Sequence, residues 1–405
     1  MTLQEIEGLL DTIHNFSRED FPGSHILALT EEDKAARDFL RSEMEKRNLK
    51  VYVDVIGNMI GVREGSEELP AVAVGSHLDS VVSGGKFDGP AGVIAGLAVI
   101  DYLNDQGLST RHPVAVINFT NEEGTRFTPD MMGSYVFNGN ADLEEIYASK
   151  ALEDPSISVK AALENIGYLG DMQVGEFPLK AFIELHIEQG KILEEKGLDL
   201  GIVEAVQGIF WTAYEFHGEA NHAGTTPMTY RKDAGKAAFK LAAYSQELAS
   251  NVGVPQVITC GHLQLTPNIP NIIPGRAYMV LDNRHPNAQV LQDTQDRLDF
   301  FARTLASEEG LKLEITPKVR VNPLTFSRQV IDTLGQAAKD QGVSHMHMIS
   351  GAGHDAQLVG MTYPAAMVFV PSRRGISHNP EEFTESRHIQ QAIEVITQAV
   401  VELAT

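Results

Sequence analysis

The stretch that decides the fold is AVAVGSHLDSVVSGGKFDGPAGV, residues 71–93. Ala71–Val74 is wholly apolar, which predicts a short strand buried on both faces. A loop rich in Gly and Ser follows, and Gly92–Leu103 has the composition of a buried helix. A buried strand that leads through a polar loop into a buried helix is typical of an α/β domain.

The same order of elements recurs along the chain. Val114–Phe119 and Ala365–Val370 predict two more buried strands. Between them the character changes: the expected strands are 210–217, 277–283 and 312–319, and the expected long amphipathic helices are 233–249 and 287–307. We therefore predict one α/β domain, formed by residues 1–208 and 321–405, that is interrupted by an inserted α+β domain at residues 209–320.

Composition narrows the class of protein. A length of 405 residues favours two domains, and 43% hydrophobic residues indicate a globular chain. The net charge of −23 argues against nucleic acid and anionic membranes as partners. The single cysteine, Cys260, excludes an internal disulfide. The acidic N-terminus does not resemble a signal peptide, and the longest apolar run, 91–100, is too short to span a bilayer. We expect a cytoplasmic protein.

Five segments place histidines or carboxylates where strand-like runs end. They contribute His77, Asp88, the pair Glu122-Glu123, His186 and His378. In open α/β sheets such strand ends gather at one edge, where ligands bind. Imidazoles and carboxylates without a thiolate suit two divalent ions, Zn²⁺ or Mn²⁺, with Co²⁺ and Ni²⁺ as alternatives. Asp79 is expected to hold the second ring nitrogen of His77.

Each residue also has a simpler interpretation. A histidine in a Gly/Ser loop usually faces solvent, Asp88 alone would be a turn residue, and adjacent acids fit a helix N-terminus. Glu184 and Glu188 fit solvated strand positions and are left out of the metal set. His354 either contacts the ligand or supports its own loop. The agreement of five segments favours the metal site.

The motifs carry a resemblance to a known family. GSHLDSVVSGGKFDGPAGV, NEEGTRF, ELHIEQG, NHAGTTPM, NIIPGR, LDNRHP, SGAGHDA and SHN occur in this order. The chain resembles the N-carbamoyl-L-amino-acid hydrolases over about residues 5–400. These belong to the hydantoinase/carbamoylase branch of the two-zinc aminoacylase/exopeptidase superfamily, together with allantoate amidohydrolase and one kind of β-ureidopropionase.

The resemblance implies a two-metal exopeptidase-like α/β fold, with residues 1–208 and 321–405 as the catalytic domain and residues 209–320 as an inserted α+β lid and dimerisation domain. It also implies a role for each metal-site residue. Asp88 would bridge two ions, and Glu122 would be the general base. One ion would take His77 and His378 and the other Glu123 and His186, or the pairing differs. The implied reaction hydrolyses a ureido C–N bond and releases an amino acid, ammonia and carbon dioxide.

The resemblance also implies substrate contacts. His222 would donate to the developing oxyanion. Arg284 and Asn271 would bind the carboxylate of a small ureido substrate, and Gln189 its carbamoyl amide. A homodimer is expected, and the sequence leaves open whether His222 acts in its own subunit or in the partner's.

Alternatives remain at this stage. Allantoate amidohydrolase and β-ureidopropionase share the same ligands, and a dipeptidase fits the lid motifs less well. A metal-free binding protein of the same fold would be expected to have lost a ligand or the base. No Gly-x-Ser-x-Gly or His-Glu-x-x-His motif occurs, which disfavours a serine hydrolase and a one-zinc protease.

Overall fold

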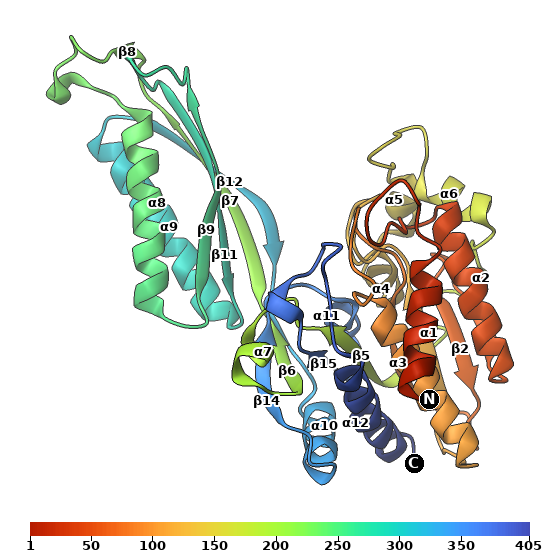
Figure 1. The fold of residues 1–405 in the computed structure, drawn as a ribbon. Coiled ribbons are helices and arrows are strands. Elements are labelled where there is room, and N and C mark those ends of the chain that lie inside the picture. The colour runs from red at the N-terminus through yellow and green to blue at the C-terminus, as the bar shows by residue number, and fades with distance from the viewer. The chain divides into compact units, whose positions relative to one another are not determined.

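The computed structural model describes all residues, 1–405, and a mixed sheet forms the centre of its larger unit (Figure 1). The order of strands begins β1-β2-β4-β3-β5-β15-β6, with β14 also paired to β6. Pairs β4–β3, β3–β5 and β5–β15 are parallel. The strands are β1 (Lys50–Val53), β2 (Met59–Arg63), β3 (Ala71–His77), β4 (Val114–Phe119), β5 (Leu179–Ile187), β6 (Leu200–Val206), β14 (His345–Ser350) and β15 (Ala365–Val370).

The central strands are buried because their side chains are apolar on both faces. Every residue of β3, β4 and β15 is buried. Helix α3 packs on β3, β4 and β5, and α12 packs on β15 and β3. The helices of this unit are α1 (Leu3–His14), α2 (Glu31–Lys46), α3 (Pro90–Asp105), α4 (Met132–Phe137), α5 (Leu143–Ala148), α6 (Val159–Ile166), α7 (Ile192–Lys196), α10 (Arg328–Asp340), α11 (Asp355–Val359), α12 (Ser386–Ala404) and the 3₁₀ turn η2 (Arg373–Gly375).

The second unit is a four-stranded antiparallel sheet in the order β12-β7-β11-β9. Helices α8 and α9 lie side by side against it (Figure 1), and their apolar faces form a separate core with residues such as Tyr214, Leu241 and Leu298. Its elements are β7 (Gly208–His217), β8 (Asn221–His222), η1 (Met228–Tyr230), α8 (Ala234–Val252), β9 (Val257–Thr266), β10 (Ile272–Ile273), β11 (Arg276–His285), α9 (Ala288–Glu308), β12 (Lys312–Val321) and β13 (Leu324–Thr325).

The two compact units comprise residues 1–204 with 326–405, and residues 205–325. Their limits lie four or five residues outside 209–320, because Val206 at the end of β6 pairs with Leu324 of β13. The predicted fold class, an α/β domain with an inserted α+β unit, is confirmed. The short helices α4, α5 and α6 were not predicted, since none exceeds eight residues. None of the helices combines the length and hydropathy that crossing a bilayer requires.

Candidate metal centre

The site lies where the parallel strands of the larger unit end. His77 is the last residue of β3, Glu122 and Glu123 follow β4, and His186 lies near the end of β5. These three strands are neighbours, so their carboxyl ends meet at one edge of the sheet. Two loops complete the cluster: Asp88 lies two residues before the start of α3, and His378 lies between η2 and α12.

The Asp88 carboxylate lies between two groups of side chains. Its Oδ1 is 3.0 Å from Nε2 of His186 and 3.8 Å from Nε2 of His77. Its Oδ2 is 3.5 Å from Nε2 of His378, which in turn is 3.3 Å from Oε2 of Glu123. The donor atoms of Asp88, His77 and His186 all lie within 4.8 Å of one another. Those of Asp88, Glu123 and His378 do so as well. The pairing therefore differs from the arrangement suggested first: His77 groups with His186, and Glu123 with His378.

The His77 ring is held by main-chain atoms. Its Nδ1–H donates to the carbonyl oxygen of Asp79 at 2.8 Å, whereas the Asp79 carboxylate is 4.0 Å away. Asp79 therefore holds the second ring nitrogen of His77 through its main-chain carbonyl and not through its carboxylate. Gly89 adopts φ +83°, and a Cβ there would come within 2.4 Å of the imidazole. A glycine is required at 89 for the ring to occupy this place.

The Asp79 carboxylate instead fixes the acidic pair. It accepts the backbone N–H of Glu122 at 3.1 Å and of Glu123 at 3.2 Å. Burial, and next the charge of Glu123, raise the pKa of Glu122 well above its usual range. Burial, and next Asp88, do the same for the pKa of Glu123. Adjacent buried carboxyls resist joint ionisation unless a cation lies beside them.

The donor set fits divalent cations. The buried Nε2 of His77 has no hydrogen-bond partner, and burial lowers the pKa of this ring to about 4, which leaves a lone pair directed into the cluster. His186 donates its Nδ1–H to the Ile187 carbonyl at 2.9 Å. Burial opposes protonation of His186, but Asp88 outweighs it and raises the pKa to about 9. A cation between the His186 ring and the Asp88 carboxylate would attract the carboxylate as the proton on His186 does.

Two residues at the site adopt left-handed backbone conformations. Gln189 has φ +57° and His378 has φ +52°. Such conformations are uncommon for residues other than Gly and cluster at functional sites. Gln189 donates its Nε2–H to Oδ2 of Asp88 at 2.8 Å, and its backbone N–H to Oγ of Ser372 at 3.0 Å. Gln189 therefore lies directly beside the second group.

Two acids expected to be solvated are buried. Glu184 is fully buried and accepts hydrogen bonds from Ser76 Oγ at 2.8 Å and from the Ala356 backbone at 2.7 Å. Glu188 accepts the backbone N–H groups at the start of α7. Period-2 alternation does place Glu184 on the face of His186, but burial of both sheet faces removes the expected solvent.

His354 supports the site from behind His186. It is buried, and the centroids of the two rings are 4.3 Å apart. Its Nε2 lies 3.1 Å from Ser350 Oγ within its own loop. Of the two interpretations open for His354, this geometry favours support of the loop and of the His186 ring.

Two polar residues near Asp88 were not predicted. Ser377 donates its Oγ–H to Oδ2 of Asp88 at 2.9 Å. Glu382 is buried and accepts the backbone N–H groups of Phe87 and Asp88 at 3.1 and 3.2 Å. Ser377 directly precedes the predicted ligand His378, so its place in the sequence could have marked it as a residue of the site. Nothing in the sequence around Glu382 distinguishes it from the exposed Glu381 beside it.

Two of the predicted substrate residues lie together in the second unit. His222 on β8 pairs with Ile272 of β10, next to Asn271. Nδ1 of His222 accepts the backbone N–H groups of Gly224 and Thr225 at 3.0 and 3.2 Å. The neutral ring therefore carries its hydrogen on Nε2, where it serves as a donor. Both His222 and Asn271 are exposed.

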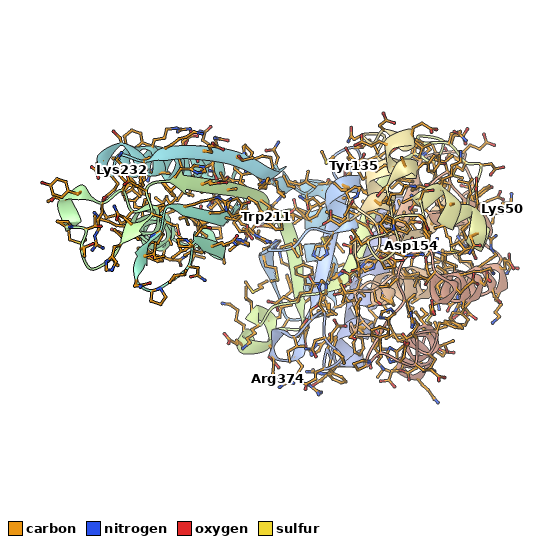
Figure 2. All side chains as sticks on the ribbon, turned by 90° about the horizontal axis from the view of Figure 1, so that it is seen from above. Lys50, Tyr135, Asp154, Trp211, Lys232 and Arg374 are labelled. Atoms are coloured by element: carbon orange, nitrogen blue, oxygen red, sulfur yellow. The ribbon has the colours of Figure 1, made fainter.

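Arg284 lies on the four-stranded sheet, at the end of β11 away from the two-stranded β8–β10 sheet that carries His222. Arg276 and Arg284 are eight residues apart on β11, or about 26 Å, and β10 precedes the Arg276 end. Figure 2 shows the separation: Lys232 marks the end near β8, and Trp211, which pairs with Asp282, marks the other. Asp282 orients the guanidinium through contacts of 2.8–3.1 Å. Within one chain, Asn271 and Arg284 lie too far apart to bind the same carboxylate.

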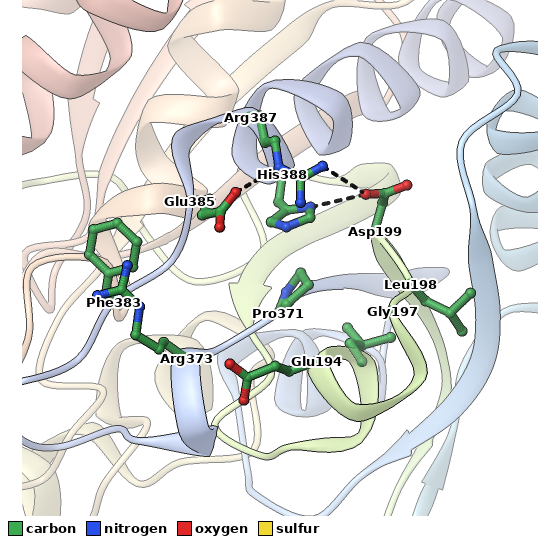
Figure 3. A pocket seen from close by; sticks show the side chains of 11 residues that line it. Glu194, Gly197, Leu198, Asp199, Pro371, Arg373, Phe383, Glu385, Arg387 and His388 are labelled. Atoms are coloured by element: carbon green, nitrogen blue, oxygen red, sulfur yellow. Dashed lines mark hydrogen bonds and ion pairs between the residues drawn. The ribbon is translucent and has the colours of Figure 1, made fainter.

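A pocket of about 420 Å³ lies elsewhere on the larger unit (Figure 3). Its charged groups pair with one another: Arg387 Nε lies 2.7 Å from Glu385, and His388 Nδ1 lies 3.3 Å from Asp199. None of the clustered donors around Asp88 lines it. We therefore place the candidate chemistry at Asp88 and not in this pocket.

Comparison with known proteins finds related enzymes along nearly the whole chain. Residues 73–402 match peptidase family M20/M25/M40. An N-carbamoyl-L-amino-acid amidohydrolase from Rhizobium meliloti is 36% identical over 94% of this chain and 92% of its own length. An allantoate amidohydrolase from Bacillus subtilis is 33% identical, covering 93% and 92%.

A solved structure extends the match to three dimensions. An amidase of the hydantoinase/carbamoylase family from Burkholderia multivorans superposes with a TM-score of 0.94 at 36% identity, covering 100% of this chain and 98% of that one. These relatives are named amidohydrolases, which identifies the chain as a hydrolase that acts on C–N bonds other than peptide bonds. The chain therefore belongs to peptidase family M20/M25/M40 and, within it, to the hydantoinase/carbamoylase amidohydrolases.

Proposed function

We propose that the protein hydrolyses the ureido C–N bond of N-carbamoyl-L-amino acids and releases the amino acid, ammonia and carbon dioxide. The observation that carries the proposal is the position of Asp88, whose two oxygens each face a separate group of donors. His77 and His186 would hold one divalent ion with Asp88, and Glu123 and His378 the other. An N-carbamoyl-L-amino-acid amidohydrolase at 36% identity supports this choice of substrate.

When bound, two such ions supply a polarised carbonyl and water that ionises near neutral pH. The chain supplies the proton transfers. Glu122 lies outside both ligand groups, with Oε2 3.5 Å from Nε2 of His77. The hydrogen bond from its backbone to Asp79 fixes its place. Glu122 would accept the proton of the attacking water and pass it to the departing nitrogen.

The second unit would supply the remaining contacts. His222 presents an Nε2–H donor suited to the carbonyl oxygen as negative charge develops on it. Arg284, whose Nε and Nη2 groups are held by Asp282, would bind the carboxylate of the substrate. Gln189, beside Asp88, would bind the carbamoyl amide.

His222 and Asn271 lie beyond the first residue of β11, whereas Arg284 lies near its last residue. This separation supports a homodimer. We propose that His222 and Asn271 act on the site of the partner subunit, while Arg284 acts on the site of its own. Mixing Glu122→Gln and His222→Ala subunits tests this directly. In each heterodimer one site would then be intact, so random mixing should restore about one quarter of parent activity. A mixture as inactive as its components would contradict action across the dimer.

A second substrate has specific support. Allantoate also presents a ureido carbonyl and a carboxylate, and an allantoate amidohydrolase is 33% identical to this chain. N-carbamoyl-β-alanine shares the same groups. We would measure ammonia release from several N-carbamoyl-L-amino acids, N-carbamoyl-β-alanine and allantoate with Mn²⁺, Co²⁺ or Zn²⁺, and amine release from a dipeptide. Preference for an N-carbamoyl-L-amino acid supports the proposal, and preference for another substrate replaces it.

A further inference from the structure

Glu382 joins two loops that are far apart in the sequence. Its Oε1 accepts the backbone N–H of Phe87 at 3.1 Å and of Asp88 at 3.2 Å, across 295 and 294 residues. Its own backbone N–H donates to the Asn379 carbonyl at 3.0 Å, which closes the turn after His378. One side chain thus holds the backbone of Asp88 from the turn that carries His378.

The side chain of Asp88 is held from the same turn. Ser377 Oγ lies 2.9 Å from Oδ2 of Asp88 and 3.3 Å from Oε2 of Glu382. Oδ2 is the oxygen that faces His378, whereas Oδ1 faces His77 and His186. The contact of Ser377 therefore acts on the half of the centre formed by Asp88, Glu123 and His378. Glu382 is tied to the same half through the turn that carries His378.

The chain makes room for this carboxylate. A Cβ at position 85 would lie 2.1 Å from the Glu382 carboxyl carbon, so only glycine fits beneath it. The next residue, Phe383, packs edge-on against Phe87, with ring centroids 5.9 Å apart, and itself lines the pocket of Figure 3. Glu382 is therefore fixed on several sides and is not a flexible surface group.

A carboxylate is a costly choice for simple packing here. Asp88, Glu122 and Glu123 already concentrate negative charge, and burying one more carboxylate beside them is unfavourable unless it is paired. Two backbone N–H groups offset part of that cost through charge-assisted hydrogen bonds. A neutral residue would fill the same space at less electrostatic cost, so the geometry points to a role for the oxygens themselves.

We propose that Glu382 is a positioning residue: it sets the spacing between the Asp88 carboxylate and the His378 ring for the ion they would share. The inference rests on the proposed metal-ligand roles of Asp88 and His378. Outer groups that orient ligands typically change metal affinity about 10- to 100-fold when removed. The effect should fall on the ion held with Glu123 and His378 and spare the ion held by the two histidines His77 and His186.

The test counts ions and measures their affinities separately from catalysis. Glu382→Ala should retain one tightly bound Zn²⁺ per chain and bind the second about 10- to 100-fold more weakly, by competition with a chromophoric chelator. Glu382→Gln should stay near the parent, since its amide oxygen still accepts both backbone N–H groups. Glu381→Ala is the matched control: this neighbour is exposed, pairs with Arg374, and should leave both affinities unchanged.

The outcomes separate the possibilities. If Glu382→Ala keeps both parent affinities while its metal-free form melts at a lower temperature, the residue is merely structural and the proposal is wrong. If Glu382→Ala does not fold, Ser377→Ala replaces it and should weaken only the second ion, by about tenfold. Equal affinities in Ser377→Ala and the parent would then overturn the proposal. A parent that binds no Zn²⁺ would instead refute the proposed function.

Discussion

Replacing Glu122 by Gln removes the proposed base and little else. The amide has nearly the same shape, and the hydrogen bond from its backbone to Asp79 at 3.1 Å does not involve the altered group. Glu122 belongs to neither ligand group around Asp88, so two ions per chain should remain. A positioned base contributes about 10²- to 10⁴-fold, so turnover should fall by that factor, or about 3–5 kcal/mol in the barrier.

The metal-free protein gives an independent check on the same variant. Burial and Glu123 raise the pKa of Glu122 above its value in the unfolded chain. The folded state then holds a proton that the unfolded state has lost, so stability falls as pH rises from about 4.5 through the raised pKa. Gln cannot ionise, so the metal-free variant should lose less stability over that window.

Three measurements decide the outcome for Glu122→Gln: ammonia release from an N-carbamoyl-L-amino acid, metal content by elemental analysis, and thermal unfolding of the metal-free form at several pH values. Turnover within about tenfold of the parent, with two ions bound, would refute the assignment of Glu122 as the base. Loss of an ion together with activity would instead show that Glu122 is a ligand.

Four further substitutions test other parts of the account. Arg284→Ala should raise KM for N-carbamoyl amino acids far more than for their carboxamides; equal effects on both would remove the proposed carboxylate contact. His222→Ala should lower kcat about 10²- to 10³-fold with both ions retained, and a change confined to KM would argue against oxyanion binding. Arg37→Ala leaves the fully buried Asp33 without its ion pair, so urea unfolding should show a loss of about 3–5 kcal/mol. The exposed pair broken by Lys34→Ala should cost less than about 1 kcal/mol, and similar losses for the two variants would contradict this.

Convergence of the donors could be predicted from sequence because strand direction has a simple consequence. His77, Glu122 and His186 each end an apolar run, and parallel neighbours bring such ends to one edge. The buried strands also identify the fold class. The proximity of these donors therefore follows from the apolar strand patterns and from the rule that neighbouring parallel strands end at one edge of the sheet.

The detailed arrangement could not be predicted in the same way. Which donors share an oxygen of Asp88 depends on side-chain directions that strand ends do not specify. The contact between Glu382 and Asp88 spans 294 residues, and no local pattern marks it. The distance between Asn271 and Arg284 emerges only once β11 is seen to run unbroken for ten residues.

The most direct test of the central claim is ammonia release from an N-carbamoyl-L-amino acid, measured as Zn²⁺ or Mn²⁺ is added back to the metal-free protein. We expect no activity without metal and a maximum at two equivalents per chain, as the two donor groups sharing Asp88 predict. Activity that persists in the presence of a strong chelator, or that saturates at one equivalent, would contradict a two-metal ureido hydrolase.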